Sequence, residues 1–288
     1  MALSIQSNMA SKSIQNQLGR TNNDLSVALE RLGSGLRINS AKDDAAGLQI
    51  ANRLNAQVRG QEAAIYNANN AMSMLQTAEG AFEEMTNIAF RMKELATQGA
   101  NGTNNSSEYT AINAEFTALT EEMTSIMENT SFGAGTKLLD GGKFDGANVT
   151  FQIGSSNDET LEVNIQAEVT AVKGAYAAGT NITNGFNGAT AAANQALAAN
   201  IITDVDSLIS DIGAARAELG ASMNRLDHTI NNVTNMKENT EAAAGQLMDA
   251  DFAKETSNMT KQQLLMNSGI SVLSASNSTS QMIGSLLR

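Results

Sequence analysis

The sequence of 288 residues contains no cysteine, no proline and no tryptophan, and only one histidine. Without cysteine, the chain can form neither disulfides nor thiolate metal sites, and it has no thiol nucleophile. A proline inside a helix costs about 3 kcal/mol, so its absence favours long uninterrupted helices. Aromatic residues are only 4% of the chain. We therefore expect thin layers of helices packed through Ala, Leu, Ile and Met rather than a thick core of rings.

The sequence also lacks the residue clusters on which enzymes depend. His228 is the only imidazole, which leaves no His-rich metal site and no obvious Ser–His pair. The glycine-rich residues 133–137 lack the spacing and the preceding strand of a phosphate loop. We therefore expect no enzyme, no cofactor and no metal site.

Charge is unevenly distributed along the chain. The net charge is -12, but residues 1–60 carry +3, so the remainder carries -15. An acidic body disfavours nucleic acid, whose phosphates it would repel. The basic N-terminal arm either meets an acidic surface on a neighbouring copy or is an ordinary solvated helix face.

No apolar run reaches the ~18 residues that a membrane-spanning helix needs, so we expect no membrane insertion. The N-terminus also lacks the continuous apolar core of a secretory signal. These features alone indicate a cytoplasmic protein.

Apolar residues recur at alternating spacings of three and four in the first half of the chain. Residues 1–32 form a narrow seam of the coiled-coil type, with Ile14, Leu18, Thr21, Leu25, Ala28 and Leu32. Residues 41–99 predict a helix of about 55 residues, whose periodic positions include Gln61 and Phe82. A loop at residues 100–107 precedes a third helix, which runs antiparallel to the second.

The middle of the chain changes pattern and the helical period then returns. Two alternating runs, at residues 149–153 and 161–165, flank a Gly-Ser-Ser-Asn-Asp segment and predict a β-hairpin. Residues 167–190 are small and glycine-rich, and we predict a short variable surface segment there. A long helix follows from about residue 191. The last pattern is a second seam that contains Phe252, Thr256, Met259, Gln263, Met266, Ile270 and Leu273.

These patterns predict a mainly α fold. We expect a long helical rod or coiled-coil bundle with paired N- and C-termini and a small β-hairpin region. A terminal seam helix buries about five large apolar side chains, which is too little to order some 30 residues in isolation. The termini therefore either fold only when many copies assemble, or close the core of an ordinary long bundle.

The stretch GSGLRINSAKDDAAGL at residues 33–48, which we call the joint, separates the first two helical patterns. We predict that Ser40 caps the second helix, with Asp43 at the acidic position of a capping box. Asp44 would then lie in the first turn, where the helix dipole favours negative charge. The paired carboxylates also suggest acid–base chemistry or metal binding. Capping is favoured because no other ligand cluster accompanies them.

The joint also carries a specific resemblance. Residues 36–48, LRINSAKDDAAGL, are similar to the signature segment of bacterial flagellins, and the segments at 67–71, 92–96, 248–255 and 269–273 resemble flagellin sequences as well. The resemblance implies an inner coiled-coil domain of residues 1–40 with 248–288, and an outer-core helical domain of 41–166 with 191–247. The joint residues Arg37, Asn39, Ser40, Asp43 and Asp44 would connect these two domains.

By this resemblance, copies of the chain self-assemble through the terminal coiled coils into the helical filament of the bacterial flagellum, for swimming motility. The assembly seam would comprise Ile14, Leu18, Leu25, Leu32, Phe252, Met259, Met266, Ile270 and Leu273. The chain would leave the cell unfolded, through the flagellar type III export apparatus. An export chaperone, the filament cap and the hook-junction proteins are the further implied partners. The predicted location therefore becomes the extracellular filament rather than the cytoplasm.

The resemblance also implies recognition by host innate immune receptors. Arg91, Leu95 and Glu115 match the arginine, leucine and glutamate of the family's receptor surface, while Phe90 stands where well-recognised members have glutamine. Leu286 and Leu287 resemble the leucines read by an intracellular sensor. The alternative function is that of a hook–filament junction protein, which shares the terminal coiled coils but would not form long filaments alone.

Overall fold

The computed structural model describes residues 8–146, 148–177 and 179–286. Its contacts divide the chain into two compact units. The terminal unit comprises residues 1–58 and 238–288, and the central unit comprises residues 59–237. The helices α2 (Ala45–Gly99) and α7 (Ala191–Met248) contribute residues to both units.

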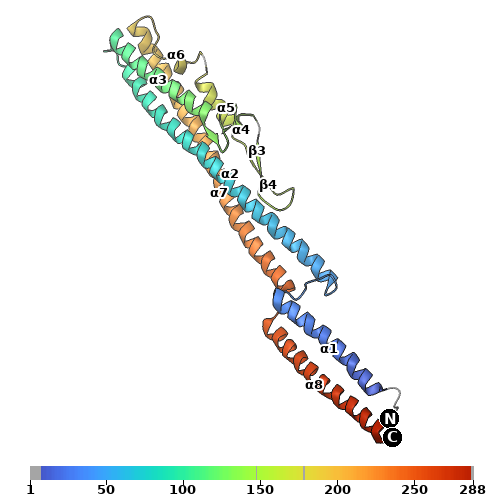
Figure 1. Ribbon diagram of the computed structural model, residues 1–288. Coiled ribbons are helices and arrows are strands. Elements are labelled where there is room, and N and C mark those ends of the chain that lie inside the picture. Colours follow the sequence, from blue (N-terminus) through green and yellow to red (C-terminus); the bar gives the residue numbers. More distant parts are fainter. Residues whose placement is uncertain (1–7, 147, 178, 287–288) are drawn as a thin grey trace. The chain divides into compact units, whose positions relative to one another are not determined.

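The terminal unit is built on two long helices, α1 (Met9–Ser34) and α8 (Phe252–Leu286), which pack side by side (Figure 1). The side chain of Asn8 caps α1 by accepting the backbone N–H of Ser11 at 3.0 Å. Gly35 ends this helix in the left-handed region, with φ 74°, and donates its N–H to the carbonyl oxygen of Arg31. The packing of α1 against α8 confirms the predicted pairing of the N- and C-terminal helices.

The central unit contains the main hydrophobic core. It lies between α2, α7 and α3 (Ser106–Asn129), and the largest of its fully buried side chains include Leu75, Phe82 and Phe116. A capping box begins α3, because Asn105 accepts the backbone N–H of Glu108 while the Glu108 carboxylate accepts that of Asn105. The three- and four-residue spacings predicted for these helices match the buried positions.

Two short antiparallel hairpins lie beside these helices. Strands β3 (Val149–Gln152) and β4 (Thr160–Val163) pair with Val149 opposite Val163 and Phe151 opposite Leu161, so the predicted hairpin is confirmed. A smaller pair, β1 (Ser131–Phe132) and β2 (Thr136–Lys137), was not predicted. The short helix α4 (Lys143–Gly146) separates the two hairpins along the chain.

Residues 167–190, predicted as a short variable surface segment, contain short helices and a few buried residues. They contain most of α5 (Gln166–Ala175) and all of α6 (Asn181–Asn184). Val169, Val172 and Ile182 are buried in the core. The ring of Phe186 packs edge-on against that of Phe116, with centroids 5.5 Å apart. The sequence pattern does not reveal these helices, because a few apolar residues, widely spaced among small ones, anchor the segment without producing a visible period.

The mainly α fold class with a small hairpin region is confirmed. The predicted domains, which divide at residues 40 and 248, concern assembly and stay a prediction. Across the described residues, no helix combines the length and the apolar character needed to cross a membrane.

Candidate functional site

The seam between α1 and α8 is narrow and partly polar. On α1 the predicted residues Ile14, Leu18, Leu25 and Leu32 are partly buried, while Thr21 and Ala28 between them are buried. Near one end of the seam, Ser11 donates its hydroxyl to the side-chain oxygen of Asn277 at 3.1 Å. The α1 half of the seam therefore lies where its spacing predicts.

On α8 only alternate members of the predicted seam face α1. Met259, Met266 and Leu273 are partly buried, but Phe252 and Ile270 are 60% and 54% exposed. Phe252 and Ile270 therefore lie outside the contact with α1, and their part in the assembly of copies stays a prediction.

The true alternate positions of the α8 seam are Glu255, Gln262, Gly269 and Ser276, which are buried or partly buried. At Gly269 the helices approach so closely that a Cβ atom would lie 2.7 Å from Cδ2 of Leu18. Glu255 is 6% exposed and forms an ion pair with Arg31 at 3.3 Å. At Gly269, a glycine thus occupies the seam position that the three- and four-residue pattern gave to Ile270.

The surface of α8 that α1 leaves exposed carries large apolar side chains at several positions around the helix. Leu264, Leu265 and Val272 are 65%, 46% and 51% exposed, in addition to Phe252 and Ile270. We call these five residues the outer apolar set. Leu264 and Leu265 line a shallow open depression together with Thr260 and Lys261. Leu264, Leu265 and Val272 lie outside the three- and four-residue spacing, so the sequence pattern does not identify them.

The joint is connected to the last residues of α7 and to Asp249, which follows this helix. Arg37 donates its backbone N–H to the carbonyl oxygen of Met248 at 2.6 Å and its guanidinium Nη2 to that of Leu247 at 2.7 Å. Leu36 and Asp249 form an isolated antiparallel bridge. Arg37 therefore satisfies carbonyl groups at the C-terminal end of α7, which have no partner within the helix.

The acidic pair of the joint works differently from its prediction. Helix α2 begins at Ala45, and Asp44 caps it by accepting the N–H of Gly47 at 2.8 Å. Ser40 does not cap the helix, so the predicted capping box is wrong. The Asp43 carboxylate accepts the N–H groups of Asn39 and Ser40 and the Ser40 hydroxyl, at 2.9 to 3.2 Å.

These contacts explain two further properties of the joint. Hydrogen bonds from the backbone and side chain of Ser40 lower the pKa of Asp43 below its ordinary value of 3.8. Gly47 is closely packed, because a Cβ there would lie 2.5 Å from Oδ2 of Asp44 and 2.8 Å from Cδ1 of Ile38, so both side chains would have to shift. Both carboxylates are thus engaged in local backbone structure. This agrees with the capping interpretation, which was favoured over acid–base chemistry or metal binding.

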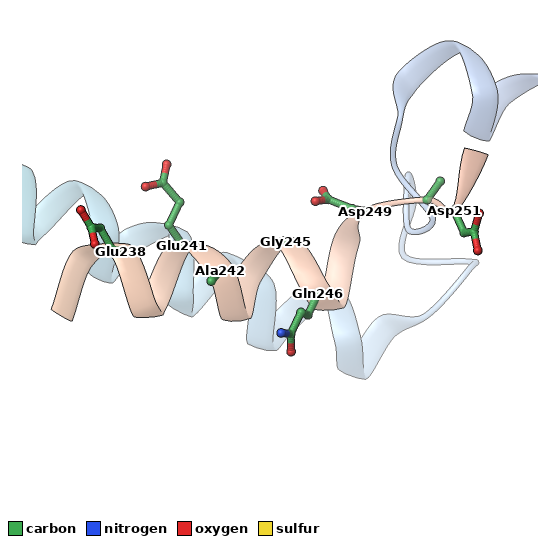
Figure 2. Close-up of a pocket in the computed structure, with 8 residues that line it drawn as sticks. Glu238, Glu241, Ala242, Gly245, Gln246, Asp249 and Asp251 are labelled. Carbon is green, nitrogen blue, oxygen red and sulfur yellow. The ribbon is translucent and has the colours of Figure 1, made fainter. Parts of the chain in front are cut away.

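A shallow hollow near the joint has an acidic lining. Glu238, Glu241, Asp249 and Asp251 line it, and Figure 2 shows their carboxylates pointing in different directions rather than toward one centre. Asp251 is used to cap α8, since it accepts the N–H of Ala253 at 2.9 Å. Within the described ranges no group of three or more His, Cys, Asp or Glu side chains could hold a metal ion.

The residues that match the family's receptor surface are only partly brought together. Arg91 forms ion pairs with Glu115 at 2.6 Å and with Glu94 at 2.8 Å, and these side chains are about half exposed. The carboxylates of Glu94 and Glu115 raise the pKa of Arg91. Leu95 is 2% exposed and belongs to the core, so it does not share that surface, whereas Phe90 is 51% exposed. Leu286 is the last residue of α8, and Leu287 lies outside the described residues.

Comparisons with known proteins agree on one family. Residues 5–143 match the bacterial flagellin N-terminal helical region, and residues 202–287 match the C-terminal helical region. Flagellin A of Vibrio cholerae is 33% identical over 368 residues, covering 95% of this chain and 96% of the relative. Polar flagellin C of Vibrio parahaemolyticus is also 33% identical, over 373 residues, with the same coverage. The alignments are longer than this chain, so they include segments that it lacks.

One solved structure, a putative flagellar hook-associated protein from Vibrio parahaemolyticus, shares the fold with a TM-score of 0.55 and 16% identity. It covers 72% of this chain and 100% of its own. At that identity the likeness concerns the fold alone, whereas both halves of the flagellin family match in sequence. The chain belongs to the bacterial flagellins, the structural subunits of the flagellar filament.

Proposed function

We propose that the outer apolar set of α8 is the surface through which copies of this chain pack in the filament. The observation that carries the proposal is the exposure of five large apolar side chains on a helix that also contacts α1. Burying one such side chain contributes roughly 1.5–3 kcal/mol. Packing several of them against neighbouring copies would therefore supply stabilisation that the narrow α1–α8 seam lacks.

The test is seeded polymerisation of a double variant, Leu264→Ser with Ile270→Ser. Both side chains are exposed in the single chain, so we expect its helical content to change little. Loss of about 3 kcal/mol of apolar contact would raise the critical concentration for polymerisation by about a hundredfold. Sedimentation and electron microscopy measure the yield and length of filaments.

Gln263→Ser is the matched control, because Gln263 is exposed on the same helix and takes the same replacement. It should polymerise as the parent chain does. Normal filaments from the double variant would contradict the proposal. Long filaments from the parent chain alone would also exclude the alternative of a hook–filament junction protein.

The joint is included in this proposal as the connection between an inner and an outer domain of the subunit. Its support is the pair of hydrogen bonds from Arg37 to the end of α7, together with the contacts of Asn39, Ser40, Asp43 and Asp44 within the joint. In the same polymerisation assay, Arg37→Ala should retain the helices of the monomer but impair the formation or shape of filaments. Unchanged filaments would reduce Arg37 to a local capping residue.

The proposed function also requires that the subunit is exported from the cell. We infer that the chain leaves the cell unfolded through the flagellar type III apparatus, with an export chaperone inside the cell, and meets the filament cap and hook-junction proteins outside. The chain carries no cysteine, so no disulfide would have to be reduced before threading. Retention of the protein inside cells that lack the export apparatus is the test.

Recognition by a host innate receptor would rest on Arg91 and Glu115, which pair on the exposed side of α2 and α3. The exposed Phe90 directly precedes Arg91 in sequence, while the buried Leu95 would require a local rearrangement to take part. Comparing receptor binding by the parent chain with that of an Arg91→Ala variant tests this part of the proposal.

A further inference from the structure

The sequence contains three Asn–Gly pairs, at residues 101–102, 184–185 and 187–188. Such pairs undergo a spontaneous reaction in which the glycine amide nitrogen attacks the side-chain carbonyl carbon of the asparagine. Glycine favours the attack because it has no side chain to obstruct it and it reaches the necessary backbone angles easily. The reaction requires that this nitrogen be accessible and not held in another hydrogen bond.

The structure separates the three pairs by this requirement. Gly185 donates its N–H to the carbonyl oxygen of Asn181 at 2.9 Å, and Gly188 donates its N–H to Oδ1 of Asn194 at 2.6 Å. These two nitrogens are therefore engaged. The nitrogen of Gly102 donates no hydrogen bond to any of the described residues, and both Asn101 and Gly102 are exposed.

The local geometry at Asn101 also favours the attack. The backbone N–H of Thr103 donates to Oδ1 of Asn101 at 3.3 Å. This bond holds the side-chain carbonyl against the backbone that follows it, close to the Gly102 nitrogen. It also places a donor on the oxygen that becomes negative when the nitrogen attacks, which stabilises the developing charge.

We propose that Asn101 is a self-modifying site, at which the side-chain amide is converted to a carboxylate without an enzyme. The Gly102 nitrogen forms a bond to Cγ of Asn101, and the bond from Cγ to the side-chain nitrogen breaks. Ammonia leaves with the proton from the Gly102 nitrogen, and a five-membered succinimide ring remains. Water then adds to either ring carbonyl and opens the ring, giving aspartate or isoaspartate with no change in oxidation state.

The modification would alter the connection between α2 and α3. The loop is held by bonds from the Asn101 N–H to the carbonyl oxygen of Gln98 and from the Asn104 N–H to that of Asn101. Isoaspartate adds a methylene to the backbone at this point and would disturb both bonds. The new negative charge lies just beyond the C-terminal end of α2, where the helix dipole disfavours it.

The test is incubation of the folded full chain at mildly alkaline pH, followed by proteolysis and mass spectrometry of the three peptides. Conversion of Asn101 should be at least roughly tenfold faster than conversion of Asn184 or Asn187, equivalent to about 1.4 kcal/mol in activation free energy. A protein isoaspartyl methyltransferase should label only the Asn101 peptide. In denaturant the three pairs should react at similar rates, because the protecting hydrogen bonds are lost.

Gly102→Ala is the variant that isolates the attacking nitrogen. Its Cβ would lie 3.3 Å from Nε2 of Gln195, the end of a flexible side chain, so the loop should tolerate it. Conversion of Asn101 should slow by roughly tenfold in this variant. The proposal is overturned if Asn184 or Asn187 reacts as fast as Asn101 in the folded chain. It is also overturned if Asn101 reacts in denaturant but stays unmodified in the folded chain.

Discussion

At the scale of single residues, Gln61 is a polar side chain that the fold buries without hydrogen-bond partners among the described residues. It occupies a periodic position of α2 and is 1% exposed, yet neither its Oε1 nor its Nε2 has a hydrogen-bond partner among the described residues. The turn between β3 and β4 and the side of α7 at Val233 enclose the surrounding hollow, which has a volume of about 240 Å³. A buried amide without a partner costs about 1–3 kcal/mol.

Replacing Gln61 by Leu should therefore stabilise the central unit by about 1–3 kcal/mol, because an apolar side chain of similar size needs no partner. The measurement is the midpoint of chemical denaturation followed by circular dichroism. Gln61→Glu is the control and should destabilise the unit, since it buries a charge in the same place. Destabilisation by Leu would show instead that ordered water satisfies the amide in solution.

At the scale of elements, the joint depends on the ionised form of Asp43. Its pKa is below 3.8 in the folded chain, because Ser40 and Asn39 donate hydrogen bonds to the carboxylate. A depressed pKa stabilises the folded form when the pH is above the ordinary pKa of 3.8. This contribution to the free energy of unfolding is lost as the pH falls through the folded-state pKa. A carboxyl-carbon NMR titration of the monomer should give a midpoint for Asp43 below 3.8. Ser40→Ala should move the midpoint toward that value, and a midpoint at or above 3.8 in the parent chain would contradict this account.

The elements also show what sequence alone could and could not predict. The long helices and the β3–β4 hairpin follow from hydrophobic period and turn residues, which are local properties. The register of α8 does not follow, because Gly269 and Ile270 both satisfy a three- and four-residue spacing. The choice between them depends on Leu18 of the facing helix, which needs the space above Gly269.

Helix α5 and the joint residues also could not be fully predicted from the sequence, because their contacts depend on other parts of the fold. Helix α5 is held by Val169 and Val172, whose burial depends on the core that they enter rather than on their own neighbours in sequence. Asp43 and Asp44 were predicted at the start of the helix, with Asp44 in its first turn, but both residues precede α2, and the residue that caps α2 is decided by where its first turn begins. Arg37 was predicted only as one of the residues that connect two domains, and the structure identifies its acceptors as the carbonyl oxygens of Leu247 and Met248.

At the scale of the whole molecule, the two units differ in how their cores are made. The central unit has a continuous core with fully buried side chains such as Leu75, Phe82 and Phe116. The terminal unit relies on a seam that includes Thr21, Glu255 and Gly269. Since local stability follows the apolar contact that each region buries, the two units should open with different free energies.

Hydrogen exchange of the dilute monomer should therefore separate the chain into two classes of amides. Those in α1 and α8 should exchange much faster than those of α2, α3 and α7 within the central unit, because few apolar contacts oppose opening of a two-helix pair. In assembled filaments the outer apolar set would be buried, and the α1 and α8 amides should become protected. Strong protection of residues 9–34 and 252–286 in the monomer would show that the terminal helices are already stable alone, so that assembly could not be what folds them.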